Sequence, residues 1–222
     1  MTVTERTTTK RKSSRPYHKG NVSEDLLAAA SRILQNERFE DLSVRRLARE
    51  VGVTPGNFYN HFESLDDLLL SLAADAFDLR ARLVKRMISS SKPRTEAVRM
   101  VSLAFVEFAI ANHQLFRIMF GQIPNATTHE RFRDAAEGSF AELVHLLYGE
   151  DIYRPDDVAW SHEHCRDAYA LFSFMYGLAR NIIENQITFP SGTKAELRRF
   201  VLEVVDLLIT GQNFVLAKRS RD

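Results

Sequence analysis

The residues best suited to chemistry lie in one short polar run, and that chemistry is hydrogen bonding to nucleic acid. Between Thr54 and His61 the side chains expected to face outward are hydroxyl, amide, phenol and imidazole groups, and no carboxylate follows until Glu63. Groups of this kind can donate to and accept from base edges, and none of them repels phosphates. The run equally fits the solvated face of an ordinary helical bundle, so the residues around it must decide.

Two short helices joined by a tight turn are expected to present this polar run. Val44 and Leu47 recur at helical spacing. Gly52 falls where this helix must end, since glycine adopts a left-handed backbone without steric cost. Thr54 can cap the second helix, and Pro55 suits its first position, where a missing N–H is unpaired anyway. The sequence therefore predicts a helix-turn-helix.

A wider pattern over residues 25–70 carries a family resemblance. The matching residues are Leu27, Ala29, Ala30, Leu34, Phe39, Ser43, Val44, Leu47, Ala48, Val51, Gly52, Val53, Tyr59, His61, Phe62, Leu68 and Leu69. On these residues the stretch resembles the DNA-binding domain of the TetR (tetracycline repressor) family of bacterial regulators. The resemblance implies an all-α, homodimeric transcription regulator, usually a repressor, and phosphate contacts from Tyr59 and His61. The operator of such a dimer is expected to be a palindrome of double-stranded DNA.

The predicted DNA-binding residues combine the polar run with the start of the preceding helix. They are Ser43, Arg45, Thr54, Pro55, Gly56, Asn57, Tyr59, Asn60 and His61. Those expected near base edges are Thr54, Gly56, Asn57 and Asn60. Ser43 and Arg45 are expected to hold phosphates together with Tyr59 and His61.

Two positions depart from the family pattern. Arg38 stands after the first helix where relatives usually have glycine, and a left-handed cap there would cost about 1 kcal/mol. Leu65 stands where a lysine usually meets a phosphate, which removes support for one backbone contact but not for the fold. Leu65 also keeps open an alternative: a helical protein of this fold that binds small molecules but has lost DNA binding.

Composition and charge bound the class of protein and its domains. The chain has 222 residues, 45% of them hydrophobic, enough for a core in one or two domains. No apolar run approaches the roughly 20 residues of a membrane span. The single cysteine excludes an internal disulfide and fits a reducing compartment. We therefore expect a cytoplasmic protein with no membrane segment.

Basic charge gathers in the N-terminal part of the chain. Residues 1–62 hold 11 Lys and Arg against 7 Asp and Glu, whereas residues 63–222 hold 19 against 22. Residues 1–20 are expected to be a disordered basic arm, which either enters a minor groove or only adds nonspecific attraction. A DNA-binding domain is expected over 21–66, followed by a helical ligand-binding and dimerisation domain over 67–222.

The C-terminal two thirds are predicted to be helical and to hold a small, largely apolar effector. The stretch EFAIANHQLFRIMF, together with Met175-Tyr176-Gly177, resembles a ligand-domain class of some TetR-type regulators. Aromatic and methionine side chains there can line an apolar pocket, although the same residues would also suit a plain core. The predicted pocket residues are Phe105, Phe108, His113, Phe116, Met119, Phe120, Tyr169, Phe172, Met175 and Tyr176.

The last two long helices are expected to form a dimer interface. Apolar residues cover more than one face of the final helix, and its own chain can cover only one side. Pairing with a second copy would complete a four-helix bundle, whereas a buried central helix in a monomer is the alternative. The predicted interface residues are Leu197, Phe200, Val201, Val204, Leu208, Gly211 and Val215.

The densest group of metal-ligating residue types is His162, His164 and Cys165. The two histidines lie two positions apart and would point to different sides of a helix, so they do not readily share one ion. The sequence has no glycine-rich phosphate loop, zinc-finger spacing or recognisable nucleophile–base pair. We expect no enzyme and no metal or cofactor, and an activator of the same architecture is the remaining regulatory alternative.

Overall fold

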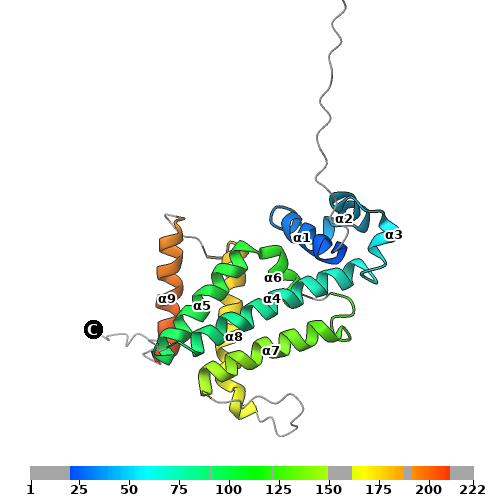
Figure 1. Ribbon diagram of the computed structural model, residues 1–222. Helices are drawn as coiled ribbons and strands as arrows, with labels where there is room; N and C mark the ends of the chain where they lie inside the picture. The colour runs from blue at the N-terminus through cyan, green and yellow to red at the C-terminus, as the bar shows by residue number, and fades with distance from the viewer. Residues whose placement is uncertain (1–20, 91, 122, 150–161, 188–191, 211–222) are drawn as a thin grey trace, which may run out of the picture.

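All regular elements that the structure describes are helical, as predicted. The computed structural model describes residues 21–90, 92–121, 123–149, 162–187 and 192–210 (Figure 1). The elements are α1 (Val22–Leu34), the short 3-10 helix η1 (Phe39–Asp41), α2 (Val44–Val51), α3 (Pro55–Phe58), α4 (Leu65–Ile88), α5 (Arg94–Ala111), α6 (His113–Phe120), α7 (Glu130–Tyr148), α8 (His162–Ile183) and α9 (Lys194–Thr210). The basic arm lies outside the described residues.

Local capping groups start and stop the two short helices. The Ser43 hydroxyl accepts from the Arg46 N–H at 3.3 Å, and α2 ends at Gly52, whose φ is +82°. The Thr54 hydroxyl accepts from the Asn57 N–H at 3.2 Å, so the predicted cap of α3 is present. Each cap satisfies a backbone donor within a few residues, which is why the sequence alone indicates this motif.

The segment after α1 corrects one expectation. Arg38 has φ −71° and ψ 143°, an extended conformation, so the left-handed strain expected there is absent. The chain reaches η1 by an extended residue instead of a left-handed cap. At the other end of the motif, Leu65 begins α4 and packs against the core that α1 to α4 share.

Two apolar cores hold the chain together, and α4 runs through both (Figure 1). The first core joins α1 to α3 with the first half of α4, and also takes in Ile118 of α6 and Ala135 of α7. The second core lies between the end of α4 and the helices α5 to α9. The first core reaches Phe77, well beyond the boundary expected at residue 66, because α4 serves both parts of the molecule.

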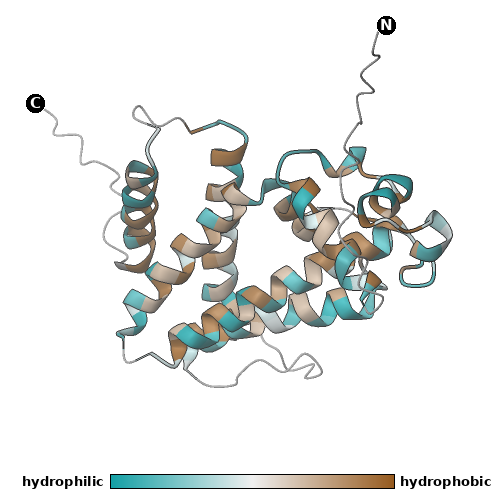
Figure 2. Cartoon of the chain, turned by 45° about the horizontal axis from the view of Figure 1, so that its top comes forward, coloured by the Kyte–Doolittle hydropathy of each residue, from teal (hydrophilic) through white to brown (hydrophobic). Residues whose placement is uncertain are grey.

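The surfaces of the helices are mixed in polarity, as Figure 2 shows by the alternation of teal and brown residues along α9 and α4. In the part of the chain that the structure describes, no helix has the length and apolar character needed to cross a membrane.

Candidate DNA-binding surface and effector cavity

The polar run predicted to contact DNA forms an exposed surface over one buried aromatic ring. Phe58 is 0% exposed, whereas Tyr59 is 58% exposed, and their rings meet edge to face with centroids 5.4 Å apart. Phe62, also buried, lies 5.7 Å from Phe58 between ring centroids. The exposed residues of this surface are Thr54, Pro55, Gly56, Tyr59, Asn60 and His61. Because Phe58 fixes the short helix from below, the polar groups have a defined position.

Helix α3 is a single turn, and its C-terminal continuation is a chain of tight turns. The Asn60 N–H donates to the Asn57 carbonyl at 3.2 Å, and the His61 N–H donates to the Phe58 carbonyl at 3.0 Å. These bonds span three residues and tighten the backbone relative to an α-helix. Asn60 and His61 are therefore presented by a turn and not by a regular helix.

Asn57 differs from its neighbours. The residue is partly buried, and its Oδ1 is inaccessible and has no hydrogen-bond partner among the described residues. A buried amide oxygen without a partner carries a desolvation cost. The base contact predicted for Asn57 would need this side chain to turn outward, so it stays a prediction.

Exposed arginines on α2 lie beside this surface. Arg45 and Arg49 are exposed and have no ion-pair partner within the described ranges. Arg46 is bound through both terminal nitrogens to Glu37, and this contact raises the pKa of Arg46 and lowers the pKa of Glu37. Arg46 therefore braces α2 against the end of α1, while Arg45 keeps its charge for a phosphate.

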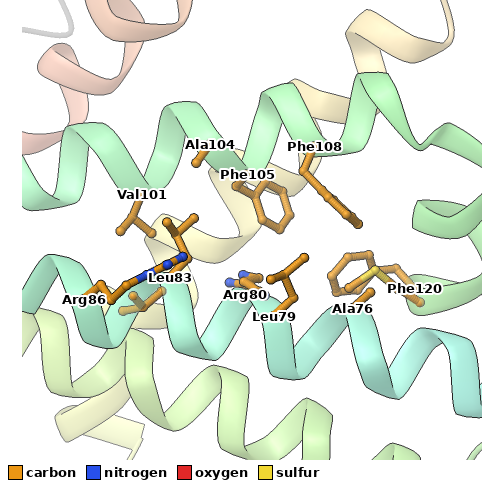
Figure 3. A pocket seen from close by; sticks show the side chains of 12 residues that line it. Ala76, Leu79, Arg80, Leu83, Arg86, Val101, Ala104, Phe105, Phe108 and Phe120 are labelled. Atoms are coloured by element: carbon orange, nitrogen blue, oxygen red, sulfur yellow. The ribbon is translucent and has the colours of Figure 1, made fainter.

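An apolar cavity of about 240 Å³ lies between α4, α5 and α6 (Figure 3). Its lining residues are Ala76, Leu79, Arg80, Leu83, Val84, Arg86, Val101, Ala104, Phe105, Phe108, Met119 and Phe120. Four of the predicted pocket residues are in this set: Phe105, Phe108, Met119 and Phe120. Its charged lining residues are two arginines, and the set contains no aspartate or glutamate.

Arg80 places a guanidinium in this apolar lining (Figure 3). Its Nε and Nη2 are inaccessible and have no hydrogen-bond partner in the part of the chain the structure describes. The guanidinium carbon lies 4.8 Å from the ring centre of Phe105 and 5.9 Å from that of Phe172. Burial lowers the pKa of Arg80 to about 10, so the group is still charged at neutral pH.

The other predicted pocket residues are divided among three surroundings. Phe116, Phe120 and Tyr176 line a second hollow of about 430 Å³, together with Phe39 and Asp66 of the N-terminal part. Met175 is 0% exposed inside the second core, and Tyr169 is 46% exposed on α8. Phe172 joins the aromatic cluster beside Arg80, and His113 lines none of the cavities described above.

Helix α6 contacts both the cavity and the DNA-reading part. On one side the Gln114 side-chain oxygen accepts from the Phe39 N–H at 3.2 Å, and Arg117 binds Glu40 at 2.7 Å. On the other side Met119 and Phe120 line the cavity. A change in the cavity that displaces α6 is therefore passed to η1, which precedes the helix-turn-helix.

The comparison with known sequences agrees with this geometry. Residues 26–72 match the model of a family described as bacterial regulatory proteins, tetR family. An uncharacterized HTH-type transcriptional regulator of Haemophilus influenzae is 23% identical over 198 residues, which cover 86% of this chain and 89% of the relative. The chain belongs to the TetR family.

Solved structures share the fold of this TetR-family regulator. A protein of unknown function from Rhodococcus sp. RHA1 has a TM-score of 0.68 and 25% identity, covering 89% of this chain and 98% of its own. FadR from Bacillus subtilis, solved in complex with stearoyl-CoA, has a TM-score of 0.63 and 16% identity, covering 86% of this chain and 99% of its own. The identity to FadR is low enough that this likeness shows the fold alone.

The last helix of this TetR-family chain divides its apolar residues between the core and the surface. Val201 and Val205 are 0% exposed in the second core, so Val201, predicted at the interface, has no surface left to bury against a partner. Leu207 is 49% exposed and was not among the predicted interface residues. The partly buried members of the predicted interface are Leu197, Phe200, Val204 and Leu208. Gly211 and Val215 lie outside the described residues.

Arg80 is the pocket residue of this TetR-family protein that sequence reasoning missed. Arginine is usually a surface residue of a helix, so its type gave no reason to place it inside. Its spacing did carry a signal. Arg80 follows the buried Ala76 by four positions and precedes the buried Val84 by four, so it occupies the inward stripe of α4.

Proposed function

We propose that this TetR-family regulator acts in the cytoplasm as a homodimeric repressor, binds a palindromic operator, and is released by a small, largely apolar effector. The exposed, carboxylate-free surface anchored on Phe58 is the observation that carries the proposal. Uncharged hydrogen-bonding groups beside a free arginine suit both base edges and phosphates. FadR of Bacillus subtilis, a relative in fold, was solved with a ligand bound, which supports a ligand role for the C-terminal helices.

Two copies are needed for the proposed operator contact. One head covers only one half-site, and symmetric pairing through α8 and α9 would present two heads to successive major grooves. The half-sites should then lie about 34 Å apart along the duplex, or a multiple of that distance. Effector binding would act by favouring one spacing of the heads, which requires different affinities for the two states.

The operator contact is tested by replacing Arg45 with methionine. The variant should bind selected DNA more weakly at all sequences, and the slope of log affinity against log salt should fall by about 1 for each head's lost phosphate contact. The measurement is fluorescence anisotropy with fragments that the wild-type protein selects from random DNA. Arg82→Met, an exposed arginine in the second half of α4, is the control and should bind as wild type.

Two outcomes would contradict this proposal. Unchanged affinity and slope in Arg45→Met would remove Arg45 from the DNA interface. Failure of the wild-type protein to select any sequence, with no salt-dependent binding, would favour the alternative in which this fold has lost DNA binding.

Coupling through α6 is tested at the Arg117–Glu40 pair. Arg117→Met removes the ion pair to η1 but leaves the cavity lining intact. A compound that raises the melting temperature of the wild type should still bind, but its effect on operator affinity should shrink by roughly 2- to 30-fold, the range of single-residue coupling changes. Arg131→Met, which breaks an exposed ion pair to Asp75 away from η1, is the control. Equal loss of release in both variants would show that α6 has no special part.

A further inference from the structure

We propose that the cavity between α4, α5 and α6 binds a compact organic acid, with its carboxylate paired to Arg80 and its apolar body among the phenylalanines. The inference deepens the proposed function by naming the chemical class of the effector, and it rests on that function only for the regulatory consequence.

The state of Arg80 is the first argument. Its guanidinium can donate five hydrogen bonds, yet Nε and Nη2 are buried and have no acceptor within the described ranges. The contacts that it does make are with the faces of Phe105 and Phe172. A buried charge normally has a partner, because leaving it unpaired carries a desolvation cost of several kcal/mol. Arg80 therefore lacks the anion that its surroundings require.

The signs of the other charges around the cavity are the second argument. Arg86 is the other charged lining residue, and no carboxylate lines the cavity. The nearby acids on α7 and α5 have other cations: Glu142 lies 3.1 Å from Lys85, and Glu107 lies 3.6 Å from Arg198. The electrostatic field in the cavity is thus positive with no internal counterion, which favours an anionic ligand over a neutral or cationic one.

The geometry of the guanidinium selects the anion. Contact with the Phe105 ring, 4.8 Å from the guanidinium carbon, restrains the guanidinium plane. A restrained guanidinium can present two parallel N–H groups, which match the two oxygens of a carboxylate. One carboxylate is therefore the expected polar group of the ligand.

The size and lining of the cavity select the rest of the ligand. Phe105, Phe108, Phe120 and several aliphatic side chains surround about 240 Å³. A dry apolar cavity of roughly 150 Å³ holds benzene, so this cavity suits one ring or a short alkyl chain with its acid group. A long acyl chain exceeds this volume.

The test compares acids with their neutral amides on the full-length protein. The probes are 3-phenylpropionate and octanoate, and 3-phenylpropanamide and octanamide of the same shape. Calorimetry should show both acids binding the wild type and each amide binding about 10- to 100-fold more weakly, the range of one charged hydrogen-bonded contact. Absence of binding by both acids at millimolar concentration would overturn the proposal, and so would equal affinities for acid and amide.

Variants of Arg80 separate binding from a merely structural role. Arg80→Met should lose the preference for acid over amide, while Arg80→Lys should retain part of it because the charge remains. The melting temperature of ligand-free Arg80→Met should equal or exceed that of the wild type, since the variant no longer buries an unpaired charge. Arg82→Met should behave as wild type in every measurement. Wild-type acid binding by a folded Arg80→Met, or a marked loss of stability shared by both Arg80 variants, would contradict the site.

The same measurements distinguish this inference from the proposed function. If the acids bind through Arg80 but do not release DNA, the anion site stands and the effector role fails. If a neutral compound binds this cavity more tightly than the acids and releases DNA, the regulator stands and the anion site fails.

Discussion

Phe58→Ala is expected to unfold the DNA-reading part of the protein and abolish operator binding. Phe58 is 0% exposed and contacts Tyr59 and Phe62 in a core that continues into α4 and α6. Truncating a buried phenylalanine to alanine costs about 3–5 kcal/mol, because apolar contacts are lost and a cavity is left. That loss is a large fraction of the 5–15 kcal/mol that typically stabilises a domain.

The measurement for Phe58→Ala is thermal or urea unfolding, combined with operator binding. For a chain of this length the melting temperature should fall by roughly 6–20 °C. Tyr59→Ala is the matched control: Tyr59 is 58% exposed, so its loss should weaken DNA binding with little change in melting temperature. A Phe58→Ala protein with wild-type stability and affinity would show that α3 is not held by this ring.

Leu207→Glu is expected to prevent dimer formation and, through it, tight operator binding. Leu207 is 49% exposed on α9, beside partly buried Val204 and Leu208. In the proposed interface a glutamate at this position would be buried without a partner, which costs several kcal/mol. A single head also loses the effective concentration that a linked second head supplies, which is worth about 10²- to 10⁴-fold in affinity.

Light scattering after size exclusion gives the mass of Leu207→Glu directly, and anisotropy gives its operator affinity. Leu207→Met conserves volume and apolar character and should remain a dimer with wild-type affinity. Because Leu207 is exposed within the single chain, the glutamate variant should keep its helical circular dichroism. A Leu207→Glu protein that stays dimeric would place the interface on a different surface.

The short-range features of this protein follow from the sequence itself. The helix-turn-helix was predictable because Ser43, Thr54 and Gly52 act on backbone groups within a few positions, and their effects need no knowledge of distant residues. The all-α class followed equally from apolar spacing along each helix. The cavity was predictable in part, because Phe105 and Phe120 belong to stretches whose aromatic content indicates either a pocket or a core.

Only the tertiary structure decided which apolar positions are core and which are surface. Val201 and Leu207 lie on one helix with similar side chains, yet α5 covers the first and leaves the second open. Arg80 is charged, yet the crossing of α4, α5 and α8 buries two of its nitrogens against Phe105 and Phe172. Burial depends on where separate helices cross, and no local pattern encodes that placement.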